Sequence, residues 1–140
     1  MKSLFYIFLL VLLVACSSKK ETEVQIKKSN LYKQSEMAAL MLQMYDANLE
    51  NKQLILEGKT PVNFSKKFAN IHTATLTDPA DRDASFQAFS EFYLDSYQQV
   101  FRSSKDSLVL KHNNTINSCI ACHKTTCIGP IPKIKKLLIP

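Results

Sequence analysis

The chain has 140 residues, enough for one domain with one core and too few for two. With 46% hydrophobic and 21% charged residues, its composition is that of a globular protein. Its formal net charge is +6, but no motif interleaves aromatic with basic residues, so nucleic acid is not an expected partner.

Residues 1–15 are expected to be a lipoprotein signal peptide. Met1-Lys2 is a short positive start, and Leu4–Val14 is an unbroken apolar run that is short for a permanent membrane span. The run ends in Leu13-Val14-Ala15-Cys16, which resembles a lipobox, the bacterial signal in which the cysteine is acylated. A plain signal peptide or an uncleaved anchor is the alternative. The sequence therefore predicts a protein lipid-anchored through Cys16 on the periplasmic or cell-surface side of a bacterial membrane.

Residues 16–30 are polar and charge-mixed, and are expected to form a flexible tether between the membrane and the domain. Loss of residues 1–15 removes one charge, Lys2, and lowers the net charge from +6 to +5. A modest positive net charge of this size is expected of a protein with an acidic soluble partner, and equally of one whose surface charge has no binding role.

Residues 31–140 are expected to be all-α and to form an antiparallel four-helix bundle, because stretches of helical periodicity are joined by short loops. The first two helices are expected from near Ser35 to Glu57 and from about Ser65 to Thr75. The third is expected to start near Asp81 to Asp83 and run to about Ser103, and the fourth to run from Ser107 to about Thr126. Ser35 is the expected N-cap of the first, and Gly58 and Gly129 are expected to end helices. The tail, Lys133–Pro140, is expected as a short turn packed back on the bundle.

The stretch that carries recognisable chemistry is Cys119-Ile120-Ala121-Cys122-His123, on the last expected helix. In a C-x-x-C-H motif the two thiols form thioethers with the vinyl groups of a haem, and the imidazole ligates its iron. The i,i+3 and i,i+4 spacings put all three side chains on one helix face. One covalent haem c is therefore expected, held by Cys119, Cys122 and His123.

The alternatives for this motif are a disulfide, two unrelated buried cysteines, or a zinc site. Zinc would need Cys127 as the fourth ligand and would have to accept the adjacent Cys122 and His123 around one tetrahedral ion. Cys127 is otherwise left over, either as a buried inert thiol or as a redox-active one.

The other two imidazoles, His72 and His112, are expected to be surface or boundary residues rather than ligands. His112 is about 16 Å from His123 at helical rise, too far to share its iron.

Together these features resemble the class II c-type cytochromes, that is, cytochrome c-prime and its low-spin relatives. The resemblance rests on the haem motif on the last of four helices, on a first helix containing Ser35–Met44, and on its end at Glu57–Pro61. It implies His123 as the proximal iron ligand and a distal position on the first helix. In low-spin members a methionine ligates the iron there; Met41 is the first choice in this chain and Met44 the second.

In cytochrome c-prime an apolar residue takes the distal position and leaves the iron open to nitric oxide or carbon monoxide, a role that would fall to Leu42. The chain departs from the family where an aromatic residue and an arginine commonly follow the proximal histidine, because it has Thr126 and Cys127 there. The haem propionates would then face Lys124, Lys133, Lys66 or water. Dimerisation is common in the family, but no unusually apolar outer stripe indicates a homodimer here.

The expected function is electron transfer by a membrane-anchored monohaem cytochrome. The chain is not expected to be an enzyme, because it lacks a paired acid-base constellation, a nucleophile elbow and a phosphate loop. Four lysines follow the haem motif and predict a basic docking patch for an acidic redox partner: Lys124, Lys133, Lys135 and Lys136. The rivals are a gas-binding module for nitric oxide or carbon monoxide, and a structural lipoprotein without haem.

Overall fold

A computed structural model describes residues 33–140, so the expected signal peptide, the lipidation site Cys16 and the tether lie outside the described residues. The described part is all-α and contains no strand. Its α-helices are α2 (Glu36–Leu56), α3 (Ala84–Arg102), α4 (Leu108–His123) and the short α5 (Ile131–Ile134). Four 3-10 helices accompany them, at Lys66–His72, Pro79–Asp81, Lys105–Ser107 and Lys135–Leu137. No helix within residues 33–140 has both the length and the apolarity to cross a membrane.

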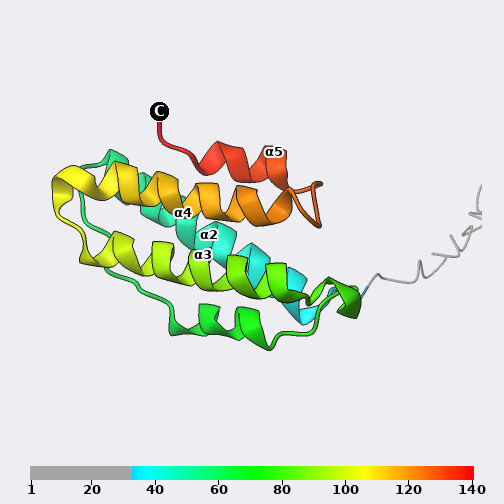
Figure 1. Ribbon diagram of the computed structural model, residues 1–140. Coiled ribbons are helices and arrows are strands. Elements are labelled where there is room, and N and C mark those ends of the chain that lie inside the picture. The colour runs from blue at the N-terminus through cyan, green and yellow to red at the C-terminus, as the bar shows by residue number, and fades with distance from the viewer. Residues whose placement is uncertain (1–32) are drawn as a thin grey trace, which may run out of the picture. The chain divides into compact units, whose positions relative to one another are not determined.

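The three long helices, α2, α3 and α4, lie side by side (Figure 1). α4 packs against both α2 and α3, and the 3-10 helix Lys66–His72 packs against the same two helices. α2 and α3 run in one direction, while α4 and the 3-10 helix run in the other. The largest apolar cluster joins all of these elements, because Met37 and Met44 of α2 pack with Phe68 and with Tyr93 and Tyr97 of α3.

The expected second α-helix, Ser65–Thr75, is wrong: this segment is the shorter 3-10 helix Lys66–His72. Its buried side chains explain the difference, because Phe68 and Ile71 are three residues apart. Side chains at i and i+3 eclipse one another on a 3-10 helix, so this spacing presents both to the core. The described residues therefore contain three long α-helices where the sequence predicts four.

The start and end of α2 agree with the sequence. Ser35 is its N-cap, and the Ser35 hydroxyl accepts a hydrogen bond from the backbone N–H of Ala38. Gly58 has φ +70°, a conformation that glycine adopts without strain. The N–H groups of Gly58 and Lys59 then bond to carbonyls of the last helical turn, which ends the helix at Leu56.

The end of α4 differs from the expectation. The helix stops at His123 rather than near Thr126, with Lys124 as its C-cap. Gly129 does not cap it, because Gly58 is the glycine with positive φ in the described chain. The C-x-x-C-H motif, Cys119–His123, thus forms the C-terminal end of α4, and α5 follows it.

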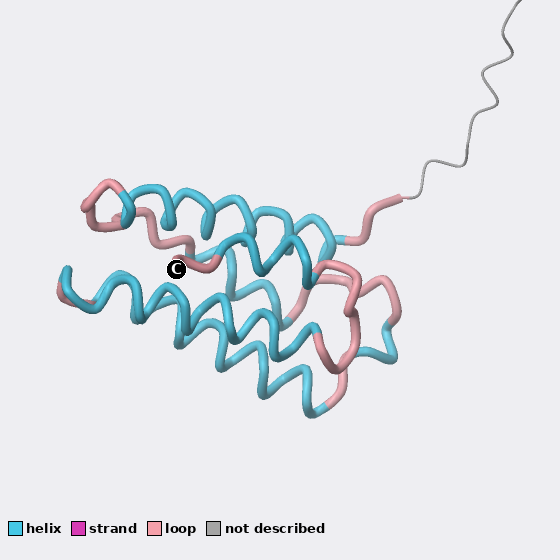
Figure 2. Tube along the Cα trace, turned by 90° about the horizontal axis from the view of Figure 1, so that it is seen from above, coloured by secondary structure: helices cyan, strands magenta, loops and turns pink. Residues whose placement is uncertain are grey.

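The C-terminal segment, defined here as residues 129–140, packs back on α2 and α4 as the sequence predicts (Figure 2). Ile134, Leu137 and Ile139 are buried, with Leu137 only 2% exposed. Lys52 of α2 donates hydrogen bonds to the carbonyls of Lys136 and Leu138, at 2.8 and 2.7 Å. Two bonds join the side-chain amide of Asn113 to the backbone of Ile139, at 2.8 and 2.9 Å.

This segment also corrects the prediction for His112, which is fully buried rather than at the surface. Its Nε2 donates a hydrogen bond to the carbonyl of Leu137 at 2.9 Å. The sequence could not show this, because the covering residues are 25 positions further along the chain. His72 is half-buried, and its Nδ1 lies 3.2 Å from the hydroxyl oxygen of Ser90. The prediction that His72 is a boundary residue is confirmed.

Candidate functional site

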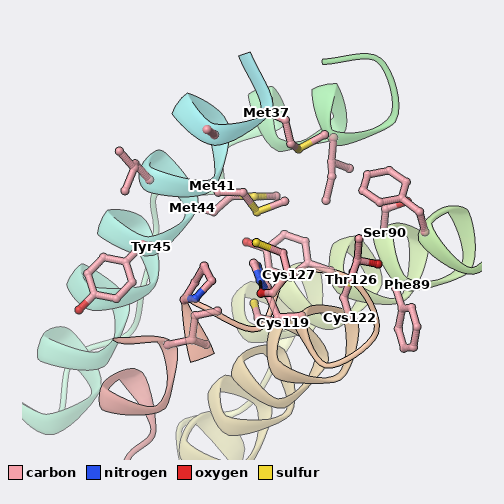
Figure 3. A pocket seen from close by; sticks show the side chains of 18 of the residues that line it. Met37, Met41, Met44, Tyr45, Phe89, Ser90, Cys119, Cys122, Thr126 and Cys127 are labelled. Carbon is pink, nitrogen blue, oxygen red and sulfur yellow. Dashed lines mark hydrogen bonds between the residues drawn. The ribbon is translucent and has the colours of Figure 1, made fainter. Parts of the chain in front are cut away.

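A cavity of about 410 Å³ lies between the last turn of α4 and the first half of α2 (Figure 3). α3 and the C-terminal segment complete its walls. Its size is within the range of about 300–1,000 Å³ found for small-molecule and cofactor sites. Apolar and aromatic side chains dominate the lining.

The three residues of the C-x-x-C-H motif, Cys119, Cys122 and His123, all line this cavity. The spacing on α4 has the predicted effect, because the helix continues through His123 and keeps all three on one face. Neither cysteine forms a disulfide. The thiols are therefore free and directed at the same space as the imidazole.

Burial raises the pKa of both thiols. The pKa of Cys119 is raised to about 12, mainly by burial and further by the nearby Cys122. Burial also raises the pKa of Cys122, and Asp83 adds to the effect. Both groups are thus protonated at neutral pH, and the Cys119 thiol donates to the carbonyl of Thr115 at 3.4 Å.

The imidazole of His123 is held by the backbone that follows α4. Its Nδ1 lies 2.7 Å from the carbonyl oxygen of Cys127. A carbonyl can only accept, so Nδ1 carries a proton; in the neutral imidazole this leaves the lone pair on Nε2. A histidine that ligates a metal commonly has this arrangement, in which a hydrogen bond from one nitrogen fixes the tautomer and orients the other.

Three methionines of α2, Met37, Met41 and Met44, line the opposite wall. Met37 and Met44 are buried in the core cluster, whereas Met41 is half-buried at its margin. Figure 3 shows Met41 and Met44 reaching from α2 toward the loop of Cys127 and the end of α4. Both candidates for a distal ligand thus share the cavity with His123, and so does Leu42, 47% exposed.

A polar corner interrupts the apolar lining. The Asn48 amide donates to the carbonyl of Met44 at 2.8 Å and to the hydroxyl of Tyr93 at 3.3 Å. The Oδ1 of Asn48 is buried with no hydrogen-bond partner. Burial raises the pKa of Tyr93 well above its usual value, so the phenol of this lining residue stays neutral.

Sequence reasoning missed this corner and part of the wall. Asn48 lies four residues after Met44 and seven after Met41, so continuing the helical spacing would have found it. Pro130 and Ile134 of the C-terminal segment also line the cavity, and no local pattern marks them.

Within residues 33–140 the thiols of Cys119, Cys122 and Cys127 are free. Among residues 33–140 no three histidine, cysteine, aspartate or glutamate side chains are grouped to hold a metal ion. The zinc alternative required Cys119, Cys122, His123 and Cys127 around one ion. Cys127 is a free and exposed thiol, so of the two alternatives given for it the buried inert thiol is wrong.

Comparison with models of protein families, with curated proteins and with solved structures found no significant match to this chain.

Proposed function

We propose that this protein is a monohaem c-type cytochrome whose role is electron transfer. The observation that carries the proposal is the shared cavity, which brings Cys119, Cys122 and His123 of α4 opposite the methionines of α2. A haem c needs two thiols at one edge and an axial ligand beside them, and a low-spin one needs a second axial ligand on the other face. The apolar lining suits a flat, largely apolar group.

In this proposal Cys119 and Cys122 would hold the haem through thioether bonds, and the Nε2 of His123 would ligate its iron. The bond from Nδ1 to the Cys127 carbonyl holds the imidazole in the ligating tautomer and raises its basicity. Met41 is our first choice for the distal ligand, because Met37 and Met44 are committed to the core cluster while Met41 lies at its margin. The bound haem supplies a one-electron redox couple, whose potential a thioether ligand raises.

We further infer that the domain is a variant of the four-helix bundle of class II c-type cytochromes, with the 3-10 helix Lys66–His72 in the place of the second helix. Its position against α2 and α3 supports this. The lipobox-like Leu13–Cys16 supports a lipid anchor on the periplasmic or cell-surface side of a bacterial membrane. The basic lysines after the motif support an acidic redox partner.

The testing experiment is an optical spectrum of the mature domain, produced together with haem-attachment machinery, in both redox states and with carbon monoxide. The proposal predicts covalently bound haem, sharp reduced bands and little response to carbon monoxide. Absence of haem bands would overturn it and favour the structural lipoprotein.

Gas binding is the second candidate, and Leu42 and the Asn48–Tyr93 corner favour it. Leu42 lines the cavity together with Met41, and so do Tyr93, whose neutral hydroxyl has a proton to donate, and its partner Asn48. An apolar distal side chain with a nearby donor suits a small diatomic ligand on an open iron. A high-spin spectrum that shifts cleanly with carbon monoxide would decide for this function and against electron transfer.

A further inference from the structure

We propose that Lys133, carried by the C-terminal segment, is the counter-ion for the carboxylate groups of the haem. This inference rests on the proposed function and assigns a binding role to one residue of the same cavity. Haem carries two propionate carboxylates. A carboxylate at the edge of an apolar site needs water, a hydrogen-bond donor or an opposite charge to offset its lost hydration.

The charges that line the cavity identify the residue. Lys133 is the one lysine or arginine among the lining residues, and Asp81 is the one carboxylate. The other lysines that the sequence brings forward for this role, Lys124 and Lys66, do not line the cavity. Among the described residues, Lys133 is therefore the one lysine or arginine in the cavity wall that could pair with a negatively charged group of a ligand.

The ammonium group of Lys133 is also free to bind. Its Nζ lies 4.4 Å from the ring centroid of Tyr45, over the ring face, and Tyr45 lines the cavity too. Within residues 33–140 the Nζ of Lys133 forms no ion pair and no hydrogen bond, and its contact is the one with the Tyr45 ring. All three N–H donors thus stay available while the ring restricts where the stem can go.

The backbone under Lys133 is fixed rather than loose. Its neighbour Ile134 is 8% exposed and Leu137 is 2% exposed. The bonds from Lys52, His112 and Asn113 to the carbonyls of residues 136–139 hold the same segment against α2 and α4. A charge on a rigid support loses little entropy when it binds, which suits a positioning role.

The experiment compares K133Q with K133R and with K135Q in the haem-containing mature protein. Lys135 is the matched control, because it is exposed on the same segment and does not line the cavity. The reduction potential of each protein is measured at about 0.1 M and about 1 M salt, where the screening length falls from roughly 10 Å to roughly 3 Å. Chemical unfolding of each variant checks that the fold is intact.

Removing a positive charge in contact with the haem carboxylates stabilises the oxidised form, which carries one more positive charge. K133Q should therefore lower the potential at both salt concentrations, and K133R should restore most of the change. K135Q should give a smaller shift that disappears at high salt.

Equal potentials in K133Q and K135Q would overturn the inference and leave the proposed function standing. Wild-type protein without haem would overturn the proposed function itself, so the two failures are distinguishable. If K133Q fails to fold, K133A takes its place: a potential lowered at both salt concentrations supports the role, and a potential equal to that of K135Q contradicts it.

Discussion

The Nδ1 of His123 donates a hydrogen bond to the backbone carbonyl of Cys127 at 2.7 Å. This bond joins the last residue of α4 to the loop that leads into the C-terminal segment, and it uses the backbone of Cys127 rather than its thiol. The proposed iron ligand is thus oriented by a contact that side-chain substitution at position 127 leaves in place.

Cys127→Ser should therefore leave the haem spectrum and potential unchanged, because the carbonyl of residue 127 remains. Cys122→Ser is the matched comparison: it would remove one of the two proposed thioether bonds and so shift the reduced absorption bands. Spectra of the two purified proteins provide the measurement. A change of spin state in Cys127→Ser would mean that the thiol itself acts at the iron.

The three methionines of α2 should respond differently to alanine substitution. If the proposed function holds, Met41→Ala should convert the low-spin spectrum to a high-spin one that binds carbon monoxide, because it removes the proposed sixth ligand. Met37→Ala should keep the low-spin spectrum and cost about 2–5 kcal/mol of stability, as expected for a buried side chain. Carbon monoxide titration and denaturant unfolding separate the two effects. Were Met44→Ala the variant that becomes high-spin, the ligand would be Met44.

Leu137→Ala should destabilise the domain by about 2–5 kcal/mol, because this side chain of the C-terminal segment is only 2% exposed. Leu138→Ala is the neighbouring control, half-buried and outside the lining of the cavity. Urea unfolding followed by helical circular dichroism gives both values. Similar midpoints in the two variants would show that the segment is not packed as described.

His112 should make stability depend on pH. Burial lowers the pKa of His112, and the charge of Lys52 lowers it further. The hydrogen bond to the Leu137 carbonyl acts in the opposite direction and raises it. The unfolded chain, with a pKa near 6.5, then binds this proton more readily than the folded protein. The contribution of His112 to the free energy of unfolding is therefore fully present above about pH 6.5 and is lost as the pH falls toward the lowered pKa of the folded state. The loss is at most about 1.4 kcal/mol per pH unit.

His112→Gln keeps a donor for the Leu137 carbonyl and removes the titration. Urea unfolding of both proteins between pH 5 and 8 is the measurement. The difference in stability between wild type and variant should change with pH below about 6.5. A difference that stays constant over this range would contradict the account of His112.

Oxidation of the reduced haem protein by ferricyanide should slow as salt rises. The anionic oxidant is attracted to exposed lysines after the C-x-x-C-H motif, and salt screens this attraction. Reversing Lys124, Lys135 and Lys136 to glutamate should slow it more at low salt than reversing Lys59, Lys66 and Lys67, which carry the same charge elsewhere. Stopped-flow rates at several salt concentrations give the comparison. Equal slowing by both triple variants would mean that net charge, not a local docking patch, guides the encounter.

The sequence by itself determined the local features of this protein. The all-α class, the N-cap at Ser35 and the end of α2 at Gly58 depend on side-chain periodicity and on backbone preferences of single residues, which are readable along the chain. The common face of Cys119, Cys122 and His123 follows from the helical repeat alone.

Only the tertiary structure decided what lies opposite that face. The tautomer of His123 depends on the path of the backbone after α4, and the burial of His112 depends on residues 25 positions away. The 3-10 form of Lys66–His72 reflects which side chains reach a shared core, and Lys133 enters the cavity wall because the C-terminal segment folds back. Local propensity does not encode such long-range contacts; packing of distant segments against one another selects them.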